Sequence, residues 1–205
     1  MCGTRRREWS WGKAGGTGDI EGADINALNI RLLQRDEIPL IWQIDRREIV
    51  ENIYVWNDGK LVLKRDYFDI KGWPPGEAEL YTPVLLDCYD RSGSFWGTFE
   101  ETTLVGVAVL ESKFIGSQQD TLQLKFLHVS RDCRKKGMAT KLFHLAVEKA
   151  SSLGAQKLYI SATPSENTVN YYLRRGCTLA TELDPELFAL EPEDIHLHYV
   201  ISKPA

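Results

Sequence analysis

Along the second half of the chain, the spacing of apolar residues predicts a strand, a short loop and then a helix. From Leu122 to Val129, apolar side chains recur with the spacing of a strand. A basic loop from Arg131 to Lys136 follows, and a helix then opens at Gly137 and ends before Gly154. The apolar positions of that helix return at helical spacing: Met138, Leu142, Phe143, Ala146, Val147, Ala150 and Leu153.

Further strands are predicted on both sides of this unit. A β-hairpin spans Ser94 to Glu111, with its turn at residues 100–102. After the helix, Lys157 to Ser161 forms a short strand and a second lies near Thr178 to Thr181. The closing run, residues 194–202, alternates as a last strand with one buried face.

A short helix is predicted between the strands at 157 and 178. Residues 163–166 (Thr-Pro-Ser-Glu) form a capping box, with Thr163 as N-cap, Pro164 as the first helical residue and Glu166 closing the box. The helix ends at Gly176, and its larger residues are Val169, Tyr171, Tyr172 and Leu173.

The first half of the chain predicts another hairpin and two helices. A first strand is expected at Ala27 to Leu33 and a helix from Asp36 to Arg47. Two runs rich in β-branched and aromatic residues then flank Asn57-Asp58-Gly59, a strong hairpin signal. A rigid connection from Asp69 to Gly76 leads to a second helix at Glu77 to Cys88.

Length and charge narrow the classes of protein. The chain has 205 residues and a mass of 23.3 kDa, which suits one domain; we expect residues 1–26 to be a flexible tail and residues 27–205 to form that single domain. The net charge of −4 and the pI near 5.6 argue against a general nucleic-acid-binding protein. Basic runs occur only at Arg5 to Arg7 and at Arg131 to Lys136.

Composition also bears on compartment and metal binding. The four cysteines stand at wide intervals without a CxxC pair: Cys2, Cys88, Cys133 and Cys177. This spacing disfavours a zinc site or a disulfide scaffold and favours a reducing, cytoplasmic setting. No apolar run approaches the ~20 residues that span a membrane, and no apolar segment of a secretory signal follows Arg5 to Arg7. His196 and His198 have the spacing of some metal ligands, but no third ligand is evident, so we expect structural histidines and no metal.

The strand, basic loop and helix start together predict a site for a pyrophosphate. Unpaired main-chain N–H groups at the start of the helix point toward one place, and the helix dipole adds positive potential there. Gly137 permits close approach of a ligand, while Arg134, Lys135 and Lys136 supply positive charge. The loop is neither a Walker loop nor a GxGxxG dinucleotide fingerprint.

Two motifs resemble those of the GNAT superfamily of N-acetyltransferases. Residues 134–139 fit its R/Q-x-x-G-x-G/A signature, and residues 165–177 (SENTVNYYLRRGC) resemble its second cofactor segment, a helix ending in Y-x-x-x-G-F. Here Tyr172 precedes Gly176 by four residues, and Cys177 replaces the usual Phe. The resemblance covers roughly residues 94–202. It implies an α/β (α+β) fold with a mixed, mostly antiparallel sheet flanked by helices. The hairpin in the N-terminal half would be an insertion into that fold.

The resemblance also implies acetyl-CoA as co-substrate. Main-chain groups of Leu127 and Val129 would bind the pantetheine arm as an added strand, and N–H groups from Arg134 to Thr140 would hold the pyrophosphate. Many members carry Asn at the position of Ser165; either Ser165 or Asn167 would bond the pantetheine arm. The expected cofactor contacts are Leu127, His128, Val129, Arg134, Lys135, Lys136, Gly137, Met138, Ala139, Thr140, Asn167 and Tyr172.

By the same resemblance, Tyr172 would be the general acid that protonates the departing thiolate, with Tyr171 as its rival. The main-chain N–H of Val129 would stabilise the oxyanion. Many relatives have a Glu as general base on the central strand, where this chain has Gln123 and Lys125. The base is therefore open, and the candidates are Glu111, His128, Glu100 and Glu101.

The acceptor is expected to be a primary amine of a small molecule or a peptide. The acidic and aromatic segments Glu51 to Phe68 and Trp73 to Tyr81 would face it, although the hairpin could instead pad the sheet or make a homodimer contact. One alternative is an acyl-CoA-binding sensor or regulatory module with little catalysis. A nucleic-acid-binding protein that uses the two basic runs is a weaker alternative, and no membrane partner is expected.

Overall fold

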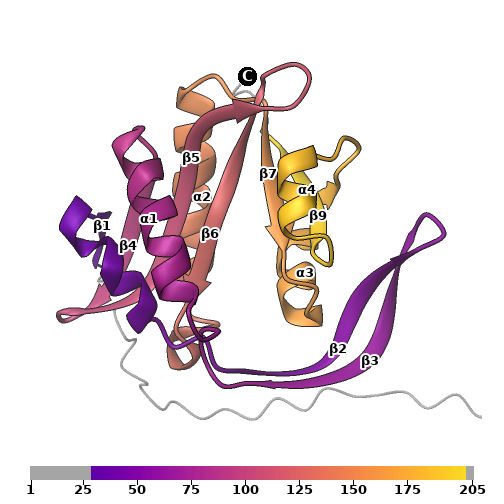
Figure 1. Cartoon of the computed structure of the whole chain (residues 1–205), viewed down its shortest axis with the longest axis horizontal. Helices are drawn as coiled ribbons and strands as arrows, with labels where there is room; N and C mark the ends of the chain where they lie inside the picture. The colour runs from indigo at the N-terminus through magenta and orange to yellow at the C-terminus, as the bar shows by residue number, and fades with distance from the viewer. Residues whose placement is uncertain (1–28, 202–205) are drawn as a thin grey trace, which may run out of the picture.

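A seven-stranded sheet runs through residues 29–201, the part of the chain described by the computed structural model (Figure 1). The expected tail, residues 1–26, lies outside the described residues, as do Cys2 and the basic run at residues 5–7. The elements in chain order are β1 (Asn29–Leu32), η2 (Arg35–Gln43), β2 (Glu48–Asn57), β3 (Lys60–Ile70), α1 (Glu77–Asp90), β4 (Ser94–Glu100), β5 (Thr103–Ile115), β6 (Thr121–Val129), η3 (Arg131–Cys133), α2 (Met138–Ser152), β7 (Lys157–Ala162), α3 (Glu166–Leu173), β8 (Thr178–Leu179), α4 (Pro185–Leu190) and β9 (Ile195–Val200).

The sheet is mostly antiparallel, as predicted, with the strand order β1-β4-β5-β6-β7-β9-β8. Its single parallel pair is β6 with β7, and that pairing covers only Thr121–Gln123 against Lys157–Tyr159. Beyond Gln123 the two strands separate, which Figure 1 shows as a widening gap between their ribbons. The second half of β6 therefore has a partner strand, β5, on one side only.

Two apolar clusters cover the two faces of the sheet. Ala108 and Leu110 of β5 pack with α2 and α3 in one cluster. Val107 and Val109, the alternate residues of the same strand, pack with η2 and α1 in the other. Because both faces are covered, β5 and β6 form the buried centre of the fold.

The first half differs from its prediction at one element. The expected α-helix at residues 36–47 is a 3₁₀-helix, Arg35–Gln43, with Pro39 at its fifth position. Proline there lacks the N–H that an α-helix would use, and its ring would clash with the carbonyl four residues earlier. The helix predicted at residues 77–88 is confirmed as α1 and extends to Asp90.

The predicted hairpin is confirmed as a separate two-stranded sheet, β2 with β3. Its turn places Asp58 and Gly59 at φ values of 46° and 81°, the left-handed conformation that a two-residue hairpin turn requires. The hairpin extends from the main sheet past the end of β6 and reaches α3 (Figure 1).

The predicted capping box at residues 163–166 is wrong by two residues. The N-cap of α3 is Ser165, whose Oγ accepts a hydrogen bond from the Thr168 N–H at 3.3 Å. Pro164 stays outside the helix, and its carbonyl accepts a hydrogen bond from the Tyr54 N–H of β2 at 2.8 Å. Contact with the hairpin therefore fixes where this helix begins.

The C-terminal strands also differ from expectation. The strand expected at residues 178–181 is shorter, and an unpredicted helix, α4, follows it. The start of α4 does carry a sequence signal, because Asp184 caps it and Pro185 is its first residue. The prediction of one buried face on the last strand is wrong: His196 and His198 are buried too, since Tyr159 and Phe188 pack against them.

Candidate active site

The end of β6 presents main-chain groups toward the side from which β7 has diverged. Ser130 N–H donates to the Val105 carbonyl at 2.7 Å, and His128 pairs with Val107 of β5. Because main-chain groups alternate in direction along a strand, those of Leu127 and Val129 point away from β5. The two residues predicted to bind the pantetheine arm thus lie on an edge without a partner strand.

The loop between β6 and α2 and the first turn of α2 contain a run of main-chain N–H groups that donate no hydrogen bond to another described residue. Lys135 and Gly137 adopt left-handed φ values of 64° and 81°, and Gly137 is the N-cap. Within residues 29–201, the N–H groups from Lys135 to Thr140 make no recorded hydrogen bond. The Met138 side chain is in the core, so only its main-chain N–H faces this site. Orphan N–H groups at the start of a helix of this length suit an anion.

Glu48, the first residue of β2, connects two of the predicted cofactor residues. Its Oε2 forms an ion pair with Arg134 Nη1 at 3.0 Å, and its Oε1 accepts from Asn167 Nδ2 at 3.2 Å. Arg134 Nε also donates to the Val129 carbonyl at 3.0 Å. The guanidinium expected to neutralise a pyrophosphate is thus held against β6 by the first residue of β2.

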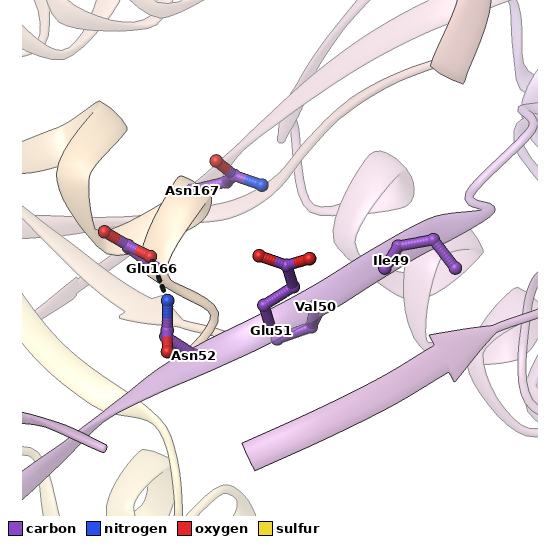
Figure 2. Close-up of a pocket in the computed structure, with 6 residues that line it drawn as sticks. All are labelled: Ile49, Val50, Glu51, Asn52, Glu166 and Asn167. Carbon is purple, nitrogen blue, oxygen red and sulfur yellow. Dashed lines mark hydrogen bonds between the residues drawn. The ribbon is translucent and has the colours of Figure 1, made fainter. Parts of the chain in front are cut away.

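The β2–β3 hairpin is attached to α3 by a series of hydrogen bonds. Besides Tyr54 N–H to Pro164, Tyr54 Oη donates to Asn170 Oδ1 at 3.0 Å, and Asn52 Nδ2 donates to Glu166 Oε2 at 2.8 Å. Beside the last of these bonds lies a cavity of about 270 Å³, lined by Ile49, Val50, Glu51, Asn52, Glu166 and Asn167 (Figure 2). The Glu51 side chain extends from β2 toward Asn167. The hairpin predicted to face the acceptor therefore adjoins the start of α3.

The two candidate tyrosines of α3 have different surroundings. Tyr172 is 6% exposed and packs against Phe143 and Tyr171, with ring centroids 6.2 Å and 5.1 Å away. Desolvation raises the pKa of Tyr172. Tyr171 lies under Arg175, whose guanidinium carbon is 3.5 Å from the ring centroid, and burial raises the pKa of Tyr171 to about 12. Both hydroxyls are therefore protonated at neutral pH.

Arg175 joins the end of α3 to the start of α2. Its Nη1 donates to the Tyr171 carbonyl at 2.8 Å, and its Nη2 donates to Thr140 Oγ1 in the first turn of α2. Sequence analysis did not select this residue, because nothing local shows that α3 ends against the basic loop. The contact holds together the two segments in which the cofactor motifs were predicted.

His128 stands among aromatic rings rather than beside a carboxylate. Its ring lies 4.9 Å from Trp73 and 5.3 Å from Phe126, centroid to centroid. Burial lowers the pKa of His128 to about 3, and the charges of Arg46 and Arg134 act in the same direction. The imidazole is thus neutral and weakly basic, which makes it a poor general base for an ammonium group.

The other candidate bases are carboxylates in two different places, of which only that of Glu111 is far from the end of β6. Glu111 is buried and paired with Arg91, at 2.8 Å and 3.2 Å. Desolvation raises its pKa, but hydrogen bonds from Arg91 and from the Ser112 N–H lower it overall. Glu111 follows Val107, the partner of His128, by four residues, or about 13 Å of strand. Glu100 and Glu101 are exposed where β4 turns into β5, and Glu100 Oε1 accepts a hydrogen bond at 3.4 Å from Cys133 Sγ, in the turn after β6.

The described residues offer neither a cluster of metal ligands nor a membrane-spanning helix. Within residues 29–201, no three or more His, Cys, Asp or Glu side chains gather as metal ligands would. None of the helices in the same range combines the length and the hydropathy needed to cross a membrane.

This chain matches a family model in sequence and several solved structures in fold. A family model described as the acetyltransferase (GNAT) family matches residues 48–177, more than half of the chain. A sequence search of characterised proteins gave no significant match. Among solved structures, nourseothricin acetyltransferase is similar at 18% identity with a TM-score of 0.61, over 86% of this chain and 99% of that one.

Two further solved structures share the fold. PaiA N-acetyltransferase from Thermoplasma acidophilum, in complex with coenzyme A, is 15% identical with a TM-score of 0.57, over 85% of this chain and 99% of that one. The ribosomal-protein-S18-alanine N-acetyltransferase from Escherichia coli is 13% identical with a TM-score of 0.54, over 86% and 95%. The family match spans the open edge of β6, the basic loop and α3. The chain is therefore an enzyme of the GNAT family of acetyltransferases.

Proposed function

We propose that this enzyme transfers an acetyl group from acetyl-CoA to a primary amine of a small molecule or a peptide. Acetyl-CoA-dependent acyl transfer follows from the family. The observation that carries the proposal is the unpaired edge at Leu127 and Val129, which leads directly into the free N–H groups of residues 135–140. A strand edge suits the amide-bearing pantetheine arm, and the N–H groups suit its pyrophosphate.

The residues at this edge fit acetyl-CoA. A Cβ on Gly137 would meet no atom within 4 Å, so the backbone there is open to a ligand. Lys135 and Lys136 are exposed beside it and supply positive charge. Asn167 is exposed at the first turn of α3, whereas Ser165 is buried and serves as the helix cap. We therefore assign the contact with the pantetheine arm to Asn167 rather than Ser165.

In this proposal a neutral amine attacks the thioester carbon, and the main-chain N–H of Val129 stabilises the oxyanion. Tyr172 then acts on the departing sulfur. Because its pKa is raised, its hydroxyl is protonated and donates a hydrogen bond as the carbon–sulfur bond breaks. The proton that the nitrogen releases restores the hydroxyl.

The acceptor would approach between the hairpin and the start of α3. Glu51 and Glu166 lie at the cavity there, and their negative charges would attract a cationic acceptor as it enters. The three solved structures named above are all described as acetyltransferases, so they give no support to the alternative of an acyl-CoA sensor.

The test has two steps. Acetyl-CoA at 100 times its dissociation constant should raise the free energy of unfolding by about 2.7 kcal/mol. A panel of amines and short peptides should then release free thiol only when enzyme and acceptor are both present, with the acetylated product identified by mass spectrometry. A folded chain that acetyl-CoA does not stabilise, or one that binds it and acetylates no amine, would contradict the proposal.

A further inference from the structure

A carboxylate that sequence analysis passed over lies at the open end of the sheet. Strand β9 runs antiparallel to β7, with Ile195 opposite Ala162, the last residue of β7. Asp194 comes just before Ile195 and so lies beside the carboxyl end of β7. Because β6 is parallel to β7, its own carboxyl end, at Val129, lies at the same edge of the sheet. Asp194 thus shares this edge with the expected thioester site.

Among the described residues, the Asp194 carboxylate stands outside the hydrogen bonds and ion pairs that hold the other buried carboxylates. It is half-buried, and its main-chain N–H donates to the Glu191 carbonyl at 3.2 Å. Within residues 29–201, however, no recorded hydrogen bond or ion pair engages its carboxylate. By contrast, the carboxylate of Glu77 in α1 forms an ion pair with Arg46 at 3.4 Å. A half-buried carboxylate without a partner is costly, which is typical of a residue retained for function.

The Asp194 carboxylate interacts electrostatically with ionisable groups from four other parts of the fold. The charge of Asp194 acts on the hydroxyls of Tyr172 in α3 and Tyr81 in α1. Glu191, at the end of α4, and Arg46, before β2, act on Asp194 itself. Desolvation raises the pKa of Asp194 to about 7, Glu191 adds to that rise, and Arg46 opposes it. Asp194 therefore lies near the expected general acid, among groups from both sides of the diverging strands.

We propose that Asp194 is the general base that takes a proton from the acceptor amine. This inference rests on the proposed acetyl transfer and names a residue for the role that Gln123 and Lys125 cannot fill. Of the candidates from the sequence, Glu111 is paired and distant, and His128 is too weakly basic. Glu100 and Glu101 are exposed to solvent, and Glu100 already accepts a hydrogen bond from Cys133. The acceptor class that fits is an amine bound as its ammonium form, next to a carboxylate and the ring of Tyr81.

The steps balance as follows. The Asp194 carboxylate takes one proton from the ammonium group, and the nitrogen lone pair forms the bond to the thioester carbon. When the carbon–sulfur bond breaks, its electron pair leaves on sulfur, which takes the proton of the Tyr172 hydroxyl. The second proton from nitrogen restores that hydroxyl, and Asp194 returns its own to water. One acetamide, one free thiol and one proton are the products.

The decisive variant is Asp194→Asn, with Glu193→Gln as its matched control. Glu193 is the preceding residue, is exposed and carries the same charge. For Asp194→Asn we expect kcat at pH 7 to fall by roughly 10²–10⁴-fold, with the dissociation constant of acetyl-CoA within twofold of wild type. The kcat of wild type should rise with pH to a plateau above about 7. That of Asp194→Asn should keep rising through pH 9, because solvent must then take the proton. Glu193→Gln should match wild type.

Three outcomes would count against the inference. Near-wild-type kcat in Asp194→Asn, with the same acid limb in its pH profile, overturns the role of Asp194 alone. A wild type that binds acetyl-CoA and acetylates no amine overturns the proposed function, and this inference with it. If Asp194→Asn does not fold, carboxyl carbon-13 NMR of wild type, with the resonance assigned through Asp194→Glu, decides instead. A titration midpoint near 7 supports the role of Asp194, and one below 5 overturns it.

Discussion

At the scale of single residues, the two neighbouring tyrosines of α3 have opposite surroundings. The ring of Tyr171 is covered by Arg175, and its buried hydroxyl is under the influence of Arg175 and Thr140. Tyr172 turns toward Phe143 and is affected by the charge of Asp194. These surroundings favour Tyr172 as the acid, in agreement with its spacing from Gly176.

We expect Tyr172→Phe to lower kcat by roughly 10²–10⁴-fold while acetyl-CoA affinity changes little, because only the transition state uses the proton. Steady-state thiol release and calorimetric titration with acetyl-CoA measure the two quantities. Tyr171→Phe is the control, and it should retain most of kcat. A damaging Tyr171→Phe beside a silent Tyr172→Phe would reverse the assignment.

Gly137 offers a second test at the residue scale. Its φ of 81° strains any side chain, so Gly137→Ala should cost about 1–2 kcal/mol of unfolding free energy. Its new methyl group would also stand where the pyrophosphate is expected, so acetyl-CoA affinity should fall at least tenfold. Gly154→Ala is a matched control, because Gly154 has a φ of 92° and equally open surroundings at the other end of α2. Gly154→Ala should lose a similar amount of stability and keep its affinity for acetyl-CoA. Equal acetyl-CoA affinities in the two variants would contradict the assignment of the loop at Gly137 to the pyrophosphate.

At the scale of elements, the β2–β3 hairpin connects the two sides of the diverging strands. Through Glu48 it holds Arg134 beside β6, and through Asn52 and Tyr54 it holds α3. The hairpin thus helps to position both segments that carry the expected cofactor motifs. Its Glu48 carboxylate also forms an ion pair with Arg134, the residue expected to contact the pyrophosphate.

Glu48→Gln should therefore tighten coenzyme A binding by about three- to tenfold, because Arg134 no longer has to leave an ion pair worth roughly 1 kcal/mol. Calorimetric titration with coenzyme A measures the change. Glu51→Gln removes the same charge from the same strand without touching Arg134, and we expect a smaller effect. Unchanged or weaker binding in Glu48→Gln would show that Glu48 orients Arg134 instead of competing for it.

At the scale of the whole molecule, buried titratable groups set how stability depends on pH. Burial lowers the pKa values of His128, His196 and His198. At mildly acidic pH, the unfolded chain therefore binds more protons at these histidines than the folded chain does. The contribution of these histidines to the free energy of unfolding is complete above about pH 6.5 and is lost as pH falls toward their lowered pKa values. Asp194 acts in the opposite direction, because its raised pKa makes the folded chain bind a proton between about pH 4 and 7.

The free energy of unfolding should therefore fall from pH 7 to pH 5 in wild type, and fall more steeply in Asp194→Asn, which has lost the opposing group. Urea denaturation at the two pH values measures both slopes. Glu193→Gln should give the wild-type slope. Equal slopes in wild type and Asp194→Asn would show that Asp194 titrates at its ordinary value in the folded chain.

The sequence by itself determined the features that depend on neighbours along the chain. The hairpin turn at residues 57–59 follows from residues that tolerate a left-handed backbone. The β6–loop–α2 unit and the placement of Tyr172 follow from contiguous motifs. These features include most of the expected cofactor site and the class of fold.

Only the tertiary structure decided the features that join distant segments. Glu48 lies 86 residues from Arg134 and 119 from Asn167, and no local pattern could bring the three together. The helix α3 begins at Ser165, two residues later than predicted, because Pro164 bonds with β2. Asp194 lies at the same edge of the sheet as the end of β6 because β9 pairs with β7. The physical reason is that local propensity and periodicity act over a few residues, whereas the partner of a side chain is chosen by how the strands pair and the layers pack.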